Sequence, residues 1–445
     1  MRKLILLLSV IASFQTLGQQ DARLYEIINS VQADRIESDI RTLANFGTRH
    51  TMSETESDTR GIGAARRWIK SEFEKISEGC GGCLEVSMQR TLEKGKEKTR
   101  ITKDTEVVNV LAIKRGSRYP NRYVIMAGDI DSRVSDPLNY TDDSPGANDN
   151  ASGMAGVIEA ARVLTKYDFE STILFVGLSG EEQGLFGGRH LAARAVDEGW
   201  DIVGVLNNDM IGNIEGVDGV IDNRTFRIFS EPTNPMDSDN KKRLRRYYGG
   251  EVDGISRQLA RYVHRMVRSY MPEMNPMLIY RLDRFGRGGH HRPFCDQGFA
   301  GIRIMEAHEN YNRQHQDLRT EDGIEYGDVI EGVNFDYAAK MTAVNAINLA
   351  ALAWAPSQPS KVSIGGAVRP STYLSWEAVE GATSYKLYFR DTTSPQWQYV
   401  REVSGDLTEF TLEGIVIDNY LFGVAAVGEN GHESLVVFPS EVVRR

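Results

Sequence analysis

The chain has 445 residues and a formal net charge of −10, with 41% apolar and 26% charged residues. This length exceeds that of an ordinary single domain and predicts two or three domains. The apolar content excludes a disordered chain, and the acidic balance argues against a nucleic-acid-binding protein. Three cysteines are too few for a fold held together by disulfides.

The first residues have the features of a secretory signal peptide. Arg2 and Lys3 form a short positive region, and the apolar run from Leu4 to Phe14 is too short to span a bilayer. Small residues precede a cleavage position before Gln19. We therefore expect residues 1–18 to be removed and the protein to be exported, to the periplasm or the medium, without a membrane span.

Two of the cysteines lie close together in a segment that follows a predicted helix. Cys80 and Cys83 have the C-x-x-C spacing of redox motifs, but they follow the helical stretch Ala64 to Ile76 and precede a strand-like segment that begins at Leu84. A redox pair would instead open a helix after a strand. We expect a local disulfide, with Cys295 left unpaired.

Helical and strand-like patterns alternate through most of the chain. Residues 19–106 begin with helical periodicity from Leu24 to Leu43 and are expected to lead into the main domain. Apolar, β-branched runs then predict strands buried on both faces. These runs are Val107–Ile113, Tyr123–Ala127, Thr172–Leu178, Ile202–Leu206 and Gly301–Met305. Helical patterns between them predict an α/β fold, a mixed and mostly parallel sheet covered by helices, over residues 107–354.

The pattern changes after a proline-containing linker at residues 355–361. Apolar and polar residues alternate over 385–390, which predicts a small all-β domain at residues 362–445. The run Leu374-Ser-Trp376 followed by Ser384-Tyr-Lys-Leu-Tyr resembles a fibronectin type III domain, which implies a β-sandwich. Such a tail is expected to bind a surface, present substrate or pack against the main domain.

Acidic residues follow three of the predicted strands. Asp129 follows one strand, Glu181 and Glu182 follow the next, and Asp209 follows a third, while Asp149 opens a helix between the first two. Ligands of open α/β sheets bind beyond the carboxyl ends of the strands. Clustered carboxylates repel one another unless a cation neutralises them. The sequence therefore predicts a divalent-metal site here.

Three motifs in chain order are similar to those of the di-zinc exopeptidases of the bacterial leucyl aminopeptidase and aminopeptidase Y type, metallopeptidase family twenty-eight. They are Gly-Ala-Asn-Asp149-Asn-Ala-Ser-Gly, Gly-Glu181-Glu182-Gln-Gly-Leu-Phe-Gly-Gly and Asn-Asn-Asp209-Met-Ile-Gly. The resemblance covers roughly Val107 to Ala353. It implies the zinc-exopeptidase fold, two divalent ions, zinc in that family, and peptide or protein substrates.

The resemblance also implies a role for each motif residue. Asp149 matches the carboxylate that bridges the two ions, and Glu181 matches the general base. Glu182 matches a ligand of one ion and Asp209 a ligand of the other.

The resemblance places the last ligand among the histidines near the end of the sheet. His315 in Asn310-Tyr-Asn-Arg-Gln-His315 is the expected ligand, and His308 is the alternative. His290 and His291 match a loop near the substrate pocket and are expected either to face substrate or to be structural.

One position departs from the family pattern. Asp129 stands where the family has a metal-binding histidine, whereas the supporting Asp131 is retained. An aspartate can bind a divalent ion. It would make the second position an all-carboxylate site, which favours a harder ion or weaker zinc binding.

These residues predict an exported metallo-exopeptidase, an aminopeptidase that hydrolyses N-terminal peptide bonds with Glu181 as general base. Two other activities on the same scaffold stay open. One is a glutaminyl cyclase with a single zinc ion, and the other is a carboxypeptidase. A non-catalytic extracellular binding protein is the alternative from a different class.

Overall fold

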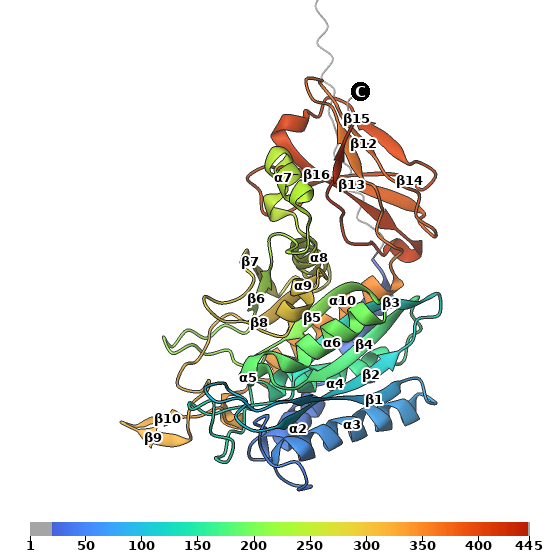
Figure 1. The fold of residues 1–445 in the computed structure, drawn as a ribbon. Helices are drawn as coiled ribbons and strands as arrows, with labels where there is room; N and C mark the ends of the chain where they lie inside the picture. Colours follow the sequence, from blue (N-terminus) through green and yellow to red (C-terminus); the bar gives the residue numbers. More distant parts are fainter. Residues whose placement is uncertain (1–19, 444–445) are drawn as a thin grey trace, which may run out of the picture.

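The computed structural model describes residues 20–443, so the predicted signal peptide lies outside the described residues. The molecule consists of a large part, built around one sheet, and a smaller C-terminal β domain above it (Figure 1). Within the described residues, no helix is both long and apolar enough to cross a membrane.

The large sheet has eight strands in the order β1-β2-β4-β3-β5-β8-β6-β7. Its strands are β1 (Glu85–Glu93), β2 (Thr105–Lys114), β3 (Tyr119–Asp129), β4 (Ser171–Leu178), β5 (Asp201–Asn208), β6 (Thr225–Ser230), β7 (Asn275–Ile279) and β8 (Gly301–Glu306). The central strands β4, β3, β5 and β8 are parallel, whereas β2 and β6 run antiparallel to the central strands beside them. Because β4 is buried along its whole length, it is an almost continuous apolar run, whereas the equally buried β8 contains the charged residues Arg303 and Glu306.

Helices cover both faces of this sheet, which confirms the α/β prediction. The α-helices of the described residues are α1 (Ala22–Ser30), α2 (Ala33–Ala44), α3 (Gly61–Gly79), α4 (Ala151–Leu164), α5 (Glu181–Gly184), α6 (Phe186–Asp197), α7 (Asp239–Tyr248), α8 (Ile255–Tyr270), α9 (His291–Asp296) and α10 (Phe335–Trp354). Of these, α7 has no buried residue and lies beside the β domain (Figure 1). One apolar core joins α2, α3, α4, α8 and α10 to one face of the sheet. A second core joins α6 and α9 to the other face.

The N-terminal segment differs in detail from its sequence pattern. The helical periodicity predicted from Leu24 to Leu43 is interrupted, because the chain is extended at Val31 and Gln32. The amide of Gln32 donates to the Glu159 carboxylate of α4 (2.9 Å) instead of continuing the helix. This segment also supplies β1, which lies at the edge of the sheet. Directly after α3, a disulfide joins Cys80 and Cys83, and Cys295 is a buried free thiol.

The C-terminal domain consists of two small sheets. Its strands are β11 (Ser363–Gly365), β12 (Thr372–Ser375), β13 (Ser384–Asp391), β14 (Tyr399–Ser404), β15 (Glu409–Leu412), β16 (Tyr420–Val427) and β17 (Glu441–Val442). The sheets β15-β12-β11-β17 and β14-β13-β16 share one apolar core that includes Trp376 and Tyr385. In the large part, β9 (Arg319–Glu321) and β10 (Ile324–Tyr326) form a hairpin that projects from the molecule (Figure 1).

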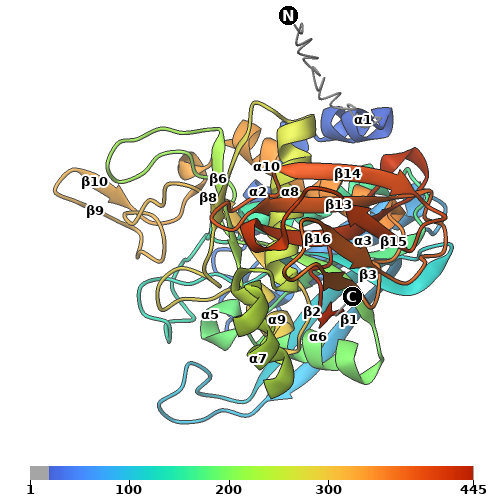
Figure 2. The same cartoon turned by 90° about the horizontal axis from the view of Figure 1, so that it is seen from above.

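The β domain lies beside α7 and α8 (Figure 1 and Figure 2). Buried ion pairs join it to the large part. Asp253 lies between two arginines: its Oδ1 is 2.6 Å from Arg261 Nη1 and its Oδ2 is 2.7 Å from Arg390 Nη2. These three side chains are at most 1% exposed. A second contact joins the two ends of the chain, because His432 Nε2 lies 2.9 Å from the Asp21 carboxylate.

Candidate metal centre and active site

Three predicted ligands converge at the carboxyl ends of the central strands. His315 Nε2 lies 2.9 Å from Asp149 Oδ2 and 2.8 Å from Glu182 Oε1. The ligand atoms of these three residues all lie within 4.8 Å of one another. One imidazole nitrogen and two carboxylate oxygens are a donor set that suits zinc. These residues therefore fit a divalent ion.

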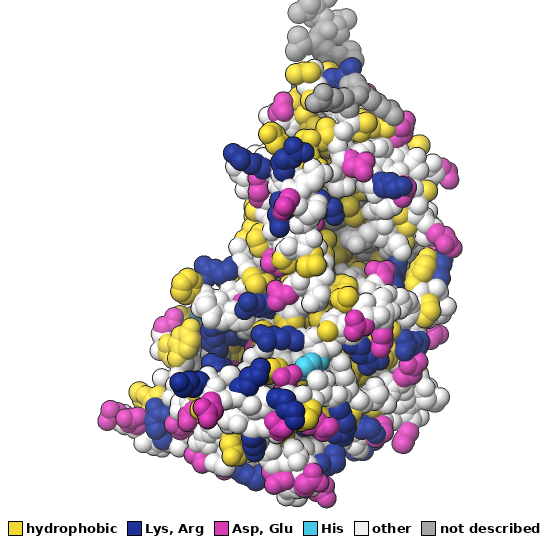
Figure 3. Space-filling view, viewed as in Figure 1, with side chains coloured by type: hydrophobic (Ala, Val, Ile, Leu, Met, Phe, Trp, Pro, Cys, Tyr) yellow, Lys and Arg dark blue, Asp and Glu magenta, His cyan; other side chains and the backbone are white. Residues whose placement is uncertain are grey.

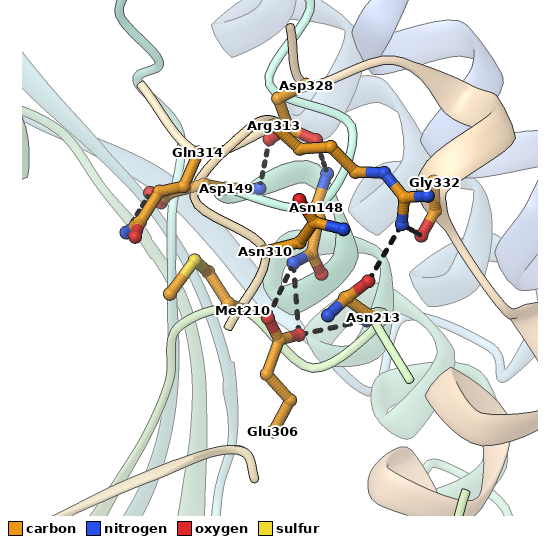
Figure 4. Close-up of a pocket in the computed structure, with 10 residues that line it drawn as sticks. All are labelled: Asn148, Asp149, Met210, Asn213, Glu306, Asn310, Arg313, Gln314, Asp328 and Gly332. Atoms are coloured by element: carbon orange, nitrogen blue, oxygen red, sulfur yellow. Dashed lines mark hydrogen bonds between the residues drawn. The ribbon is translucent and has the colours of Figure 1, made fainter. Parts of the chain in front are cut away.

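Hydrogen bonds to the backbone hold Asp149 in place (Figure 4). The amides of Asn148 and Asp149 donate to the two carboxylate oxygens of Asp328, at 2.9 and 2.6 Å. The Asn148 side chain in turn donates to the buried Glu306 at the end of β8 (3.0 Å). Because these bonds fix the turn before α4, the Asp149 carboxylate points toward His315.

Asp131 sets the direction of the two adjacent glutamates. Its carboxylate accepts the backbone amides of Gly180 (2.8 Å), Glu181 (3.2 Å) and Glu182 (3.0 Å). Asp131 therefore supports the turn at the start of α5 and is not itself in the ligand cluster. With the turn fixed, Glu182 reaches His315 while Glu181 lines a neighbouring pocket.

The pocket beside the cluster, with a volume of about 330 Å³, contains Glu181, Glu182 and His315. Burial raises the pKa of Glu181 well above its usual range, and repulsion from Glu182 and Asp209 raises it further. Five arginines also line the pocket, namely Arg100, Arg133, Arg189, Arg287 and Arg292. Lys and Arg side chains gather on this face of the molecule, around the place of α5 (Figure 3).

The cluster residues influence one another's protonation. Burial opposes the charged form of Glu182, but His315 and Arg133, whose Nε lies 2.7 Å from Glu182 Oε2, lower its pKa to about 2. Burial also opposes the charged form of His315, but Glu182 and Asp149 raise its pKa to about 9. The two carboxylates thus attract positive charge to the point where Nε2 lies.

The other two predicted ligands do not join this cluster. Asp129 Oδ1 lies 2.5 Å from His290 Nδ1, and its Oδ2 accepts the Asn150 side-chain amide (2.7 Å). Asp209 Oδ2 pairs with Arg303 Nη2 at 2.8 Å. Both acids are therefore engaged by groups of the protein itself.

The other three histidines considered from the sequence lie outside the ligand cluster. His290 is buried against Asp129, and His291 Nε2 donates to the carbonyl of Leu282 (2.8 Å). His308 is partly exposed and lies 3.9 Å from Asp222. Among the histidines, only His315 belongs to the three-residue group that could hold an ion within the described residues.

Sequence reasoning missed Arg303. It lies in the apolar strand β8 and is fully buried. A charged residue inside such a run was the available signal, because a buried charge needs a partner. The partner itself could not be named from the sequence.

Comparison with known proteins identifies the family. Residues 109–331 match the model of Peptidase family M28. A "Probable zinc metalloprotease" of Pyrenophora teres f. teres is 40% identical over 94% of this chain and 87% of its own length. A relative of the same description from Pyricularia oryzae is 37% identical over 94% of this chain and 84% of its own.

Solved structures share the fold at low sequence identity. LapA of Legionella pneumophila has a TM-score of 0.53 at 17% identity, over 76% of this chain and 79% of LapA. An aminopeptidase from Aneurinibacillus sp. strain AM-1 has a TM-score of 0.51 at 13% identity, over 73% and 95% of the two chains. From the family match and the identity to its relatives, the chain belongs to Peptidase family M28 and is a metallopeptidase.

Proposed function

We propose that this metallopeptidase is an exported zinc aminopeptidase. The observation that carries the proposal is the separation of two adjacent glutamates: Glu182 joins Asp149 and His315 in the ligand group, while Glu181 lines the same pocket outside that group. Zinc is proposed from the donor set and from the printed names of the relatives. The β domain is proposed to be of the fibronectin type III kind.

The protein's own groups would perform the proton transfers. When bound at the cluster, zinc would polarise the scissile carbonyl and acidify the attacking water. Glu181 would accept the proton of that water and return it to the leaving amine. Its raised pKa suits this task, because a carboxylate that holds a proton more readily is a better general base.

The substitution Glu181→Gln tests the proposal. It should lower kcat for aminoacyl anilides by about 10²–10⁴-fold while the zinc content stays unchanged. Glu198→Gln is a matched control, because Glu198 pairs with Arg194 on the exposed part of α6. Hydrolysis by Glu181→Gln at the wild-type rate would overturn the role of Glu181.

The arginines of the pocket favour carboxypeptidase activity as a second candidate. Within the described residues, no acidic side chain forms an ion pair with Arg189 or Arg292, although both line the pocket next to Glu181. Guanidinium groups bind carboxylates well. A free C-terminal carboxylate, or an acidic side chain, would therefore be attracted to this pocket.

A pair of peptide substrates separates the two activities. An aminopeptidase cleaves a peptide with a free N-terminus whether or not the C-terminus is amidated, and it spares the N-acetylated form. A carboxypeptidase cleaves a peptide with a free C-terminus whether or not the N-terminus is acetylated, and it spares the amidated form. Arg189→Ala should raise the KM for peptides that carry a free C-terminal carboxylate or an acidic side chain. Arg194→Ala, on the same helix, should leave that KM unchanged.

A further inference from the structure

We infer that this chain binds a single divalent ion, and that the guanidinium of Arg303 supplies the positive charge at the second metal position implied by the family resemblance. The inference rests on the proposed zinc-dependent function. It replaces the two-ion expectation drawn from the sequence.

Arg303 is fixed beside Asp209. It projects from β8, a strand that is buried throughout, and its side chain is 0% exposed. Its Nη2 lies 2.8 Å from Asp209 Oδ2, while its Nη1 lies 3.1 Å from Asp283 Oδ1 and donates to the carbonyl of Gly288 (2.9 Å). The guanidinium is therefore held from several sides, by Asp209, by Asp283 and by a backbone carbonyl.

A divalent ion bound to Asp209 would lie against this guanidinium. Two cations in a buried site repel each other strongly, because little solvent screens them. Asp209 already has a compensating charge in Arg303, so it has no need of a metal ion.

Asp129, the other acid at this position, has both oxygens engaged. Oδ1 meets His290 Nδ1 and Oδ2 meets the Asn150 amide. Asn150 cannot simply turn away, because its side-chain nitrogen also donates to the Asn208 carbonyl (2.7 Å) and its oxygen accepts the amide of Gly153 (3.1 Å). Neither oxygen of Asp129 is therefore free to bind a metal ion.

The first position differs in geometry, because its ligand atoms converge within 4.8 Å of one another and its arginine lies on the other oxygen of Glu182, Oε2. Asp149 and Glu182 share one imidazole nitrogen, that of His315, and the fixed cation at this position is Arg133, which pairs with Glu182. Two carboxylates and an imidazole that converge on one point leave room for one divalent ion. The contrast between the two positions carries the inference.

The decisive measurement is the metal content of the full-length purified chain after zinc loading and removal of loosely bound ions. We expect one zinc per chain and, in a crystal, one anomalous peak beside Asp149, Glu182 and His315. Two ions per chain, with a second peak beside Asp209, would overturn the inference.

Two single variants locate the ion. His315→Ala should lose the bound zinc, whereas Asp209→Asn should keep one zinc per chain. A centre with two ions predicts instead that Asp209→Asn falls from two to one. If Asp209→Asn does not fold, the wild-type count decides.

A double variant tests the part played by Arg303. Asp129→His combined with Arg303→Met removes the fixed cation and supplies an imidazole ligand, and it should bind a second zinc. A folded double variant that still binds one zinc would overturn the role given to Arg303. One zinc without any peptidase activity would contradict the proposed function alone, and two zinc ions with activity would contradict this inference alone.

Discussion

Carboxylates are buried at two places in this molecule, and the protein neutralises them differently. At the domain interface, Asp253 has an arginine at each oxygen, and Glu433 receives Arg265 (2.9 Å) and the Tyr388 hydroxyl (2.6 Å). At the active site, Asp149 and Glu182 converge on a single imidazole. Glu182 also pairs with Arg133, so the convergence of ligand atoms on one point, and not the presence of an arginine, distinguishes the metal site from the structural contact.

Removal of the imidazole should have the largest effect. His315→Ala takes away one of three ligands, so zinc binding fails and kcat/KM should fall on the order of 10³-fold or more. Zinc content and kinetics measured together check this. His308→Ala is the control, because His308 lies apart from the cluster and should behave like wild type.

Removal of the interface carboxylate should cost stability instead of activity. Asp253→Ala leaves Arg261 and Arg390 buried without their shared partner. The free energy of unfolding should fall by about 3–5 kcal/mol. Denaturant titration measures this, and the kcat of the folded fraction should be unchanged. A loss below about 1 kcal/mol would mean that water enters the interface.

Acid should weaken the same interface. Burial raises the pKa of Glu433, but Arg265 and Lys386 outweigh burial and hold it below its usual value. A lowered pKa contributes stability that is present above the pKa of the unfolded chain, about 4.3, and is lost as the pH falls through the folded value. Glu433→Gln should cost about 1.5–3 kcal/mol at pH 7. The stability difference between Glu433→Gln and the wild type should shrink near pH 3. An equal difference at pH 7 and pH 3 would contradict this account.

An exposed contact between the same two domains should matter least. Arg118 Nη2 lies 2.8 Å from Glu380 Oε1, but the two side chains are 39% and 81% exposed. Arg118→Ala should change the free energy of unfolding by less than about 1 kcal/mol. A larger loss in thermal or denaturant unfolding would show that exposure is not what separates this pair from Asp253.

The central strands could be predicted because strands buried on both faces are rich in apolar, β-branched residues, as in β4. Glu182 could be proposed from its place at a strand end and Asp149 from its place at the start of a helix, whereas His315 was proposed from the family resemblance. The partners of Asp129 and Asp209 could not, because His290 and Arg303 are distant in sequence and only the folded chain brings them together.

The contacts of the domain interface could not be predicted from the sequence for the same reason. Asp253 and Arg390 are 137 positions apart, and neither lies in a recognisable motif. The break between α1 and α2 could not be predicted either. The local periodicity favours a continuous helix, whereas the break depends on a hydrogen bond to the distant Glu159.

The contact between Asp21 and His432 spans 411 positions of the chain. Such a contact closes nearly the whole polypeptide into a loop, and it can form only when almost all of the chain has been synthesised. This link can therefore form only late in synthesis, whereas Leu24 and Ile27 of the same helix pack into the core of the large part. A protease that cuts near Asp21 would distinguish chains that have completed this closure from those that have not.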